Sequence, residues 1–387
     1  MNDLKEKLKT LCIFRELLKD KVLSALCTYF ENPAGSTYAD FVAQLYQANG
    51  GNLGEYIKEL CFNSENIYVK TIGLGKNVPK YMVSSLHSEL DILQEVSELN
   101  KEALCKGLPY RGFLPEFTTT GLRLKDIYLH RAENISKYGY GIYVGNRMFY
   151  VEKGGNIVPV LHPDKISLSN LVDYERERKI ILDNTKALLR GKPAANILLT
   201  GDAGTGKSST VKAVANALWD EGIRVIEIRK DQLHDISKIL DELSGNPLKF
   251  ILFIDDLSFL KDDDNFNALK AVLEGSVTVK SPNVVIYATS NRRHIIKEKF
   301  SDREGDDVHR NDTMQELISL SERFGIHITF SKPDKETFLH IVHCMAEENH
   351  IDMPVDELDM LAERFVLERG GRSARLARQF IDGLLSK

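Results

Sequence analysis

The sequence predicts an α/β fold in which a parallel sheet is followed by a helical C-terminal region and preceded by a mostly helical N-terminal region and a short β segment. Three observations lead to this prediction. Between about residues 167 and 331, short apolar runs alternate with helix-patterned stretches, as in a parallel sheet with crossover helices. Before about residue 135 the apolar spacing is helical, and from Pro333 onward only helical signals follow.

Residues 1–135 are expected to form a helical N-terminal domain. Leu4, Leu8 and Leu11 begin an apolar stripe at helical spacing, and turn-forming residues interrupt the pattern at 32–36 and 49–52. This region contains no catalytic constellation. We therefore expect it to recruit a partner.

The region 136–166 changes its period. Aromatic and β-branched residues are separated by turns at Gly145-Asn146 and Gly154-Gly155, which predicts two or three short strands. Its glycines lack the strand, turn and helix order of a dinucleotide-binding fingerprint. We interpret the segment as a structural bridge between the helical domain and the sheet.

The five strands expected in the sheet cover residues 196–200, 224–228, 250–254, 284–288 and 326–330. Directly after the first of them, residues 201–208 read GDAGTGKS and match the phosphate-binding loop pattern GxxxxGK[ST]. In this loop backbone N–H groups bind phosphate oxygens, Lys207 reaches the β- and γ-phosphates, and the Ser208 hydroxyl binds Mg²⁺. A glycine turn without a ligand is the alternative. The nucleotide-binding candidates are Gly201, Asp202, Ala203, Gly204, Thr205, Gly206, Lys207, Ser208 and Ser209.

Two carboxylates follow the third expected strand. The apolar run 250–254 ends in Asp255-Asp256, at the sheet edge where ligands of open α/β sheets bind. We expect Asp255, with Ser208, to hold Mg²⁺, and Asp256 to polarise the attacking water as a general base. Two solvated loop acids are the alternative interpretation.

From about residue 167 to 387 these motifs resemble the AAA+ ATPases. The strand 284–288 leads into Thr289-Ser290-Asn291, similar to the first sensor motif, in which Asn291 would contact the lytic water or the γ-phosphate. The segment 320–325 is similar to the box that carries the arginine finger of Holliday-junction branch-migration motors and replication initiators. The resemblance implies that Arg323 acts in a neighbouring subunit's site. A structural arginine at a helix C-terminus is the alternative.

The resemblance also assigns the outer walls of the site. Residues 370–380 look like the second sensor motif, in which a lid arginine touches phosphate; Arg375 aligns best and Arg372 second, while a solvated basic helix face is the alternative. Residues 168–175 are similar to the segment that wraps adenine, with Val172 and Tyr174 as pocket candidates. The family usually has glycine where Asp173 stands. The implied fold is an AAA+ P-loop parallel sheet over 167–331 with a helical lid over 332–387.

Within the superfamily, the motifs resemble most closely a bacterial AAA+ family known only as a domain of unknown function. Its members share an LVDYERE-like segment, a GDxGTGKSS loop, an IDDLSF strand and a GRSxRxARQF end. The second acid is Asp256 rather than the glutamate common in AAA+ motors, which is also similar to replication initiators and helicase loaders.

The resemblance implies an Mg²⁺-dependent ATPase that binds ATP and ADP and remodels or loads a macromolecular partner. A finger that acts between subunits implies nucleotide-dependent homo-oligomers. One alternative is a nucleic-acid-associated loader or initiator with ATP as a switch, and a second is a chaperone-like remodeller of a protein client. A small-molecule kinase is disfavoured, because the sensors, finger and lid would then be coincidences.

Composition sets the remaining expectations. The chain has 51 Lys plus Arg against 56 Asp plus Glu, a formal charge of -5, so it carries no global basic footprint for nucleic acid. Its five cysteines are scattered without a CxxC pair, which suits reduced thiols. No apolar stretch approaches ~18 residues. We expect a cytoplasmic protein that does not bind membranes.

Overall fold

The computed structural model describes residues 2–257, 264–274, 281–291 and 322–386. The chain divides into two compact units. Unit 1 comprises Met1–Gly145 and the short loop Gly245–Leu248, and unit 2 comprises Asn146–Ser244 and Lys249–Lys387. Each unit is described separately.

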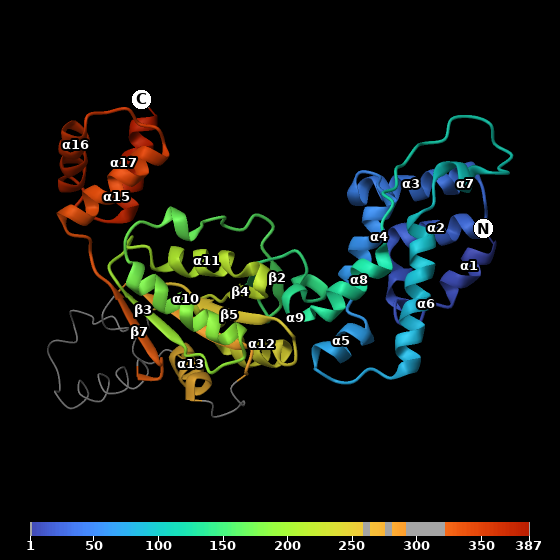
Figure 1. The fold of residues 1–387 in the computed structure, drawn as a ribbon, viewed down its shortest axis with the longest axis horizontal. Coiled ribbons are helices and arrows are strands. Elements are labelled where there is room, and N and C mark those ends of the chain that lie inside the picture. Colours follow the sequence, from blue (N-terminus) through green and yellow to red (C-terminus); the bar gives the residue numbers. More distant parts are fainter. Residues whose placement is uncertain (1, 258–263, 275–280, 292–321, 387) are drawn as a thin grey trace. The chain divides into compact units, whose positions relative to one another are not determined.

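Unit 1 is helical, as the sequence predicts (Figure 1). Several of its helices begin at a side chain that accepts hydrogen bonds from the first turn, as at Asp20, Asn52, Asn66 and Asn100. Short 3₁₀ turns cover Arg15–Lys19 and Gly141–Tyr143. The helices are α1 Asn2–Lys9, α2 Lys21–Glu31, α3 Gly35–Asn49, α4 Leu53–Phe62, α5 Ile67–Gly73, α6 Lys80–Ser97, α7 Lys101–Cys105, α8 Leu124–Glu133 and α9 Ile135–Tyr138.

A buried carboxylate on α6 organises the N-terminal end of unit 1. Glu89 accepts hydrogen bonds from the backbone N–H groups of Cys12, Ile13 and Phe14 at 2.9, 3.0 and 2.9 Å. These bonds offset the cost of removing the carboxylate from water. The same helix places Leu86, Leu90 and Leu93 in the hydrophobic core of the unit. The apolar stripe at the start of the sequence is therefore fixed to α6 by both packing and hydrogen bonds.

Unit 2 is built on a seven-stranded sheet with the order β2-β1-β4-β5-β6-β3-β7. Only the β1–β2 pair is antiparallel, and the described strands include all five expected from the sequence, with small shifts at their ends. The strands are β1 Met148–Val151, β2 Ile157–Pro159, β3 Ile197–Gly201, β4 Ile223–Glu227, β5 Lys249–Ile254, β6 Val284–Ser290 and β7 Ile326–Phe330. The predicted α/β class with a mostly parallel sheet is confirmed.

Part of the segment expected to be a structural bridge, from β1 to β2, forms one edge of this sheet. β1 pairs in parallel with β4, with Met148 opposite Val225 and Tyr150 opposite Glu227. Gln232 extends the connection, since its Nε2 donates to the Val151 carbonyl at 2.7 Å. The glycine turns do separate β1 from β2 and from the residues before them, as predicted. The local pattern could not reveal β4 as a partner, because β4 lies more than 70 residues away in the sequence.

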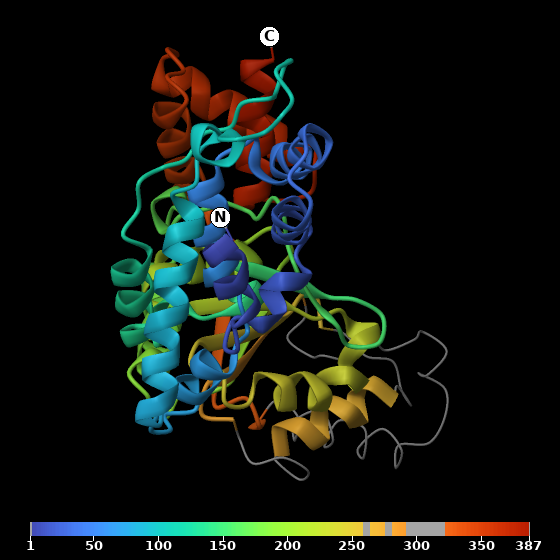
Figure 2. The same cartoon turned by 90° about the vertical axis from the view of Figure 1, so that its right-hand side faces the viewer.

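Helices cover the sheet and explain why its strands are apolar on both faces. Against one face pack α10 Glu175–Leu189 and α11 Lys207–Ala217, which lie side by side in Figure 1. Ile181, Val211 and Val214 from these helices share a core with alternate strand residues such as Ile251 and Tyr287. The helices α12 Ile236–Leu243 and α13 Asp264–Glu274 lie beside each other, yellow and orange in Figure 2.

Three helices at the C-terminus form the predicted lid, red in Figures 1 and 2. They are α15 Lys335–Glu348, α16 Val355–Leu367 and α17 Ala374–Leu385. Phe338, Ala362 and Ile381, one from each helix, are buried in a separate hydrophobic cluster. Among the residues that the structure describes, no helix is both long and apolar enough to span a membrane.

Candidate functional site

A cavity of about 570 Å³ lies in unit 2 where the phosphate-loop motif, the two acids and the lid meet. Its walls come from the segment before α10, from the loop between β3 and α11, from the ends of β5 and β6, and from α15 and α17. The predicted residues that line it are Val172, Tyr174, Ala203, Gly204, Thr205, Gly206, Lys207, Ser208, Ser209, Asp255, Asp256, Asn291 and Arg375. Gly201 and Asp202 begin the same loop and lie outside this lining.

Glycines let the loop curl tightly after β3. Gly201, Gly204 and Gly206 have φ values of +139°, +81° and +91°, which side chains rarely allow. A Cβ at Gly201 would lie 2.0 Å from the Phe330 carbonyl oxygen, and a Cβ at Gly204 would lie 3.0 Å from the Arg375 Cβ. The loop then leads directly into α11, an 11-residue helix whose N-terminus lines the cavity, as in known phosphate sites.

Lys207 is almost fully buried at the base of the loop, with 5% of its surface exposed. Its Nζ donates to the carbonyls of Gly201 and Asp202 at 2.9 and 2.7 Å and to Asn291 Oδ1 at 3.1 Å. Burial lowers the pKa of Lys207, while the nearby carboxylates, including Asp255, act to raise it. A bound anion would favour the charged lysine, because opposite charge offsets desolvation.

The first acid faces the serine of the loop. Asp255 Oδ1 accepts hydrogen bonds from Ser208 Oγ and from Thr289 Oγ1, both at 2.6 Å. A serine hydroxyl and a carboxylate thus stand in contact at the entrance to α11. Mg²⁺ prefers oxygen ligands and is commonly held in nucleotide sites by few side chains together with phosphates and water. The donor set of Ser208 and Asp255 therefore fits this ion.

The second acid is paired with the predicted sensor. Asn291 Nδ2 donates to Asp256 Oδ1 at 2.6 Å, and both side chains are exposed toward the cavity that they line. Because Asn291 Oδ1 also accepts from Lys207, one amide links the phosphate loop to the second acid. Lys207 begins α11, Asp256 follows β5 and Asn291 follows β6, and the parallel sheet brings these three residues together.

The wall expected to hold adenine begins with an unusual backbone. Asp173 and Tyr174 both have φ near +61°, in the left-handed region that glycine occupies most readily. The glycine that the resemblance implies at position 173 would adopt this conformation readily, and aspartate is among the residues that tolerate it. The Tyr174 hydroxyl donates to the Ser331 carbonyl at 2.6 Å, and its ring lies 5.1 Å from that of Phe330. Burial raises the pKa of Asp173 and raises that of Tyr174 to about 12.

The lid arginines separate into two environments. Arg375 lines the cavity, and its backbone N–H donates to the Gly204 carbonyl at 3.3 Å. Arg372, the second candidate, is outside the lining: its Nε and Nη2 donate to the two carboxylate oxygens of Glu363 at 2.9 and 2.7 Å. A bidentate pair of this kind fixes the guanidinium plane. The structure thus places Arg375, and not Arg372, in the cavity lining, and the role of either arginine toward a nucleotide stays a prediction.

Arg323, the expected finger, lies away from the cavity of its own chain. Its Nη2 is 2.5 Å from Glu274 Oε1 at the end of α13, and both side chains are about one-third exposed. Phe324, the next residue, is buried. Of the expected finger box, residues 320 and 321 lie outside the described residues. Whether Arg323 acts in a neighbouring site stays a prediction.

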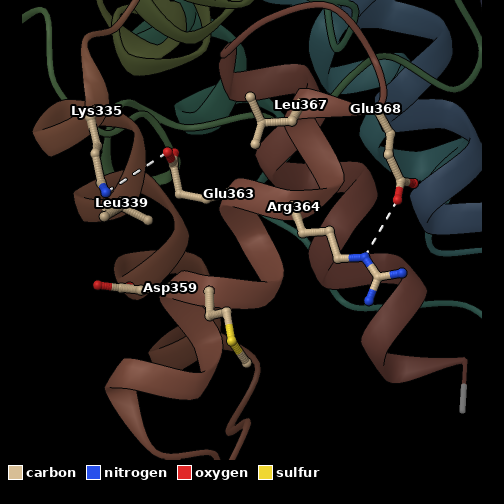
Figure 3. Close-up of a pocket in the computed structure, with 8 residues that line it drawn as sticks. Lys335, Leu339, Asp359, Glu363, Arg364, Leu367 and Glu368 are labelled. Carbon is tan, nitrogen blue, oxygen red and sulfur yellow. Dashed lines mark ion pairs between the residues drawn. The ribbon is translucent and has the colours of Figure 1, made fainter.

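A second hollow, of about 560 Å³, lies on the lid between α15 and α16 (Figure 3). Two ion pairs mark it: Lys335 Nζ is 3.9 Å from Glu363, and Arg364 Nε is 3.5 Å from Glu368. None of the predicted nucleotide-binding residues is in its lining. The predicted loop residues 203–209, the two acids and the sensor asparagine instead line the cavity beside the phosphate loop.

Residues 145–387, well over half of the chain, match the family described as "Protein of unknown function (DUF815)". The chain belongs to this family. The match begins at the boundary of unit 2, so residues 1–144, nearly all of unit 1 of this DUF815 protein, lie outside it.

The DUF815 chain is also similar to parts of two curated proteins. It is 25% identical over 178 residues to the chromosomal replication initiator protein DnaA of Limosilactobacillus fermentum, covering 43% of this chain and 37% of that one. It is 22% identical over 152 residues to the signal recognition particle protein of Rickettsia bellii, covering 39% and 31%. The chain thus spans about a third of the length of these curated relatives.

Among solved structures, a match is the RuvB Holliday junction branch migration motor of Thermotoga maritima. The identity is 19% and the TM-score 0.39, over 56% of this chain and 63% of that one.

Several residues that line the cavity of this DUF815 protein have no role in the sequence analysis, and Thr289, Arg378 and Arg178 are among them. Thr289 was part of the sensor motif but received no role, although its place at the end of a strand was a usable signal. Arg378, one turn beyond Arg375, was considered only as part of a solvated helix face. Arg178 lines the cavity from α10, and its Nη1 donates to the carbonyls of Leu168 and Leu171 at 3.1 and 2.5 Å, which fixes the base of the predicted adenine wall.

Proposed function

We propose that this DUF815 protein is an Mg²⁺-dependent AAA+ ATPase that couples ATP hydrolysis to the remodelling or loading of a macromolecular partner. The observation that carries the proposal is the linked cluster in one cavity: Lys207 and Ser208 from the loop, Asp255 and Asp256 from the end of β5, and Asn291 from the end of β6. Strand ends of a parallel sheet are where such ligands bind.

The roles follow from the contacts. Lys207 would exchange its carbonyl and Asn291 partners for phosphate oxygens of ATP, and Ser208 and Asp255 would hold Mg²⁺. When bound, this ion would supply positive charge to the β- and γ-phosphates. Asp256 would take a proton from the attacking water that Asn291 orients. Arg375 would add a positive charge from the lid, and Val172 and Tyr174 would border the adenine.

An ATP-switched, nucleic-acid-associated loader or initiator is the second candidate. The partial similarity to a chromosomal replication initiator protein favours it. The formal charge of -5 gives the whole chain no general attraction for nucleic acid, so this function would need a local basic surface. A small-molecule kinase is disfavoured, because the lid arginine and the sensor asparagine would then have no assigned use.

The proposal predicts different losses at two residues of the cluster. Lys207→Ala should abolish ATP binding, because it removes a ground-state phosphate contact. Asp256→Asn should keep ATP binding and lower turnover by about 10²–10⁴-fold, the contribution of a general base. Titration calorimetry measures the first effect and steady-state phosphate release the second.

Asp183→Asn is the matched control, since Asp183 is an exposed aspartate on α10 that does not line the cavity. This variant should change neither ATP affinity nor turnover. An equal loss of ATP affinity in the Lys207 and Asp256 variants would contradict the role given to Asp256.

A further inference from the structure

The Thr289 side chain lies between the two acids of the proposed ATPase site. Thr289 is only 2% exposed, near the end of β6, between β5 and β3 in the sheet. Side chains alternate along a strand, so Thr289 points to the same face as Tyr287, which packs in the core formed with α10 and α11. Ser208 lies in the first turn of α11 on this face. The sheet therefore aims the threonine hydroxyl at the start of the nucleotide-binding helix.

Both hydrogen-bonding capacities of the Thr289 hydroxyl are used on the acids. Its Oγ1 donates its one proton to Asp255 Oδ1 at 2.6 Å and accepts from the Asp256 N–H at 3.0 Å. The hydroxyl thus fixes a side-chain oxygen of the first acid and the backbone of the second.

The backbone of Asp256 needs such a contact. Ile254 pairs with Ala288, and the next bond from β5 to β6 is from the Leu257 N–H to the Thr289 carbonyl at 2.7 Å. Residues 255 and 256 therefore leave the strand ladder between these two connections. Asp256 has a φ of +52°, which is uncommon for a residue other than glycine. The Asp256 N–H, no longer in the ladder, is bonded instead to Thr289 Oγ1 and, at 3.2 Å, to Asp255 Oδ1.

The outer partners of the acids are groups that a nucleotide would engage. Ser208 contacts Asp255, and Lys207 is linked to Asp256 through Asn291. Under the proposed function, Ser208 and Lys207 turn to Mg²⁺ and phosphate. We infer that Thr289 is a positioning residue that keeps Asp255 aimed at the Mg²⁺ site and Asp256 in its left-handed conformation throughout. This inference rests on the proposed function.

Replacing Thr289 tests the inference through Mg²⁺ dependence as well as turnover. Thr289→Val keeps the branched shape and removes the hydroxyl, whereas Thr289→Ser keeps the hydroxyl. ATP affinity is measured by calorimetry in Mg²⁺ and in EDTA, and turnover by phosphate release. We expect the ATP affinity of Thr289→Val in EDTA to equal that of the parent. The gain in ATP affinity on adding Mg²⁺ should be about 10–100-fold smaller, and turnover should fall by a similar factor, as for other residues that orient metal ligands. Thr289→Ser should retain both.

Thr185→Val is the matched control. Thr185 is also fully buried in unit 2, and its hydroxyl bonds to the Ile181 carbonyl and the Tyr287 hydroxyl at 2.8 Å, away from the cavity lining. It should leave the Mg²⁺ dependence unchanged. If Thr289→Val does not fold, Thr289→Ala is measured in the same way.

Two results would overturn the positioning role while the parent protein still hydrolyses ATP. One is a Thr289→Val protein with the full Mg²⁺ effect and full turnover. The other is an equal loss of affinity in EDTA and in Mg²⁺, which would mean that the residue supports the loop in general. A parent protein whose ATP affinity ignores Mg²⁺ and that releases no phosphate would instead overturn the proposed function, and this inference with it.

Discussion

At the scale of single residues, Arg372 and Arg375 lie three positions apart in the lid and have different surroundings. Ser373 caps α17, and Arg375 follows inside the first turn, against the phosphate loop. Arg372 precedes the cap and is held by Glu363 of α16. The hydrogen bonds in this pair raise the pKa of Arg372 and lower that of Glu363, so both groups stay charged in their contact. We propose that Arg372 stabilises the lid and that Arg375 contacts the nucleotide.

The two arginines should therefore respond differently to removal. Arg375→Ala should weaken ATP binding by about 10–100-fold. This is the loss expected when one hydrogen bond to a charged group, worth about 1.5–3 kcal/mol, is removed. Arg372→Ala is the matched control and should leave ATP affinity nearly unchanged. Calorimetry with each variant makes the comparison. A loss of affinity confined to Arg372→Ala would reverse this assignment.

At the scale of elements, the end of α13 and the turn before β7 are joined by the Glu274–Arg323 ion pair. The turn is anchored beside it: Phe324 is 1% exposed, and a Cβ at Gly325 would lie 3.0 Å from that of Ala195. Arg323 thus extends from a fixed backbone at a partly exposed position. An arginine placed in this way could reach a second chain after exchanging Glu274 for a phosphate, since an exposed ion pair contributes little stability.

A mixing experiment tests this finger. Arg323→Ala should bind ATP normally but hydrolyse it poorly, because its guanidinium is proposed to act in the neighbouring site. Mixing Arg323→Ala with Lys207→Ala subunits should restore part of the turnover, where an intact site meets an intact finger. Glu274→Gln should keep turnover, since it removes a partner within the chain and leaves the arginine in place. No recovery at any ratio, in a mixture shown to co-assemble, would argue against action between subunits.

At the scale of the whole molecule, the chain combines a helical unit with an ATPase-like unit, and the family match leaves residues 1–144, nearly all of the helical unit, uncovered. The proposed chemistry lies entirely in unit 2. We propose that unit 1 recruits the partner on which that chemistry acts. Bound ATP would then control the affinity of the protein for this partner, because a ligand shifts a protein toward the state that it binds better.

Capture with full-length variants identifies the kind of partner. Asp256→Asn with ATP should retain the partner, and Lys207→Ala, which cannot bind ATP, is the control that should release it. Recovery that survives nuclease and moderate salt indicates a protein client. Recovery that disappears under both treatments indicates nucleic acid, because phosphate contacts weaken steeply with salt. Equal recovery with both variants would contradict ATP control of partner binding.

The sequence by itself determined what depends on short-range order. Lys207 and Ser208 are adjacent in an eight-residue pattern, and the runs that became β3 to β7 are apolar because both faces of the sheet are covered. Asp255, Asp256 and Asn291 could be placed at one edge because parallel strands end on the same side. Helical spacing was sufficient to predict the lid and the helical character of unit 1.

Only the tertiary structure decided which distant groups meet. The structure pairs β1 with β4 and places Thr289 between the acids. It also places Arg375 in the cavity lining and Arg372 against Glu363. Each of these contacts depends on segments separated by many residues or on the direction of one side chain. The physical reason is that hydrogen bonds and ion pairs act over about 3–4 Å, whereas a sequence pattern fixes a backbone period and leaves the partner across the fold open.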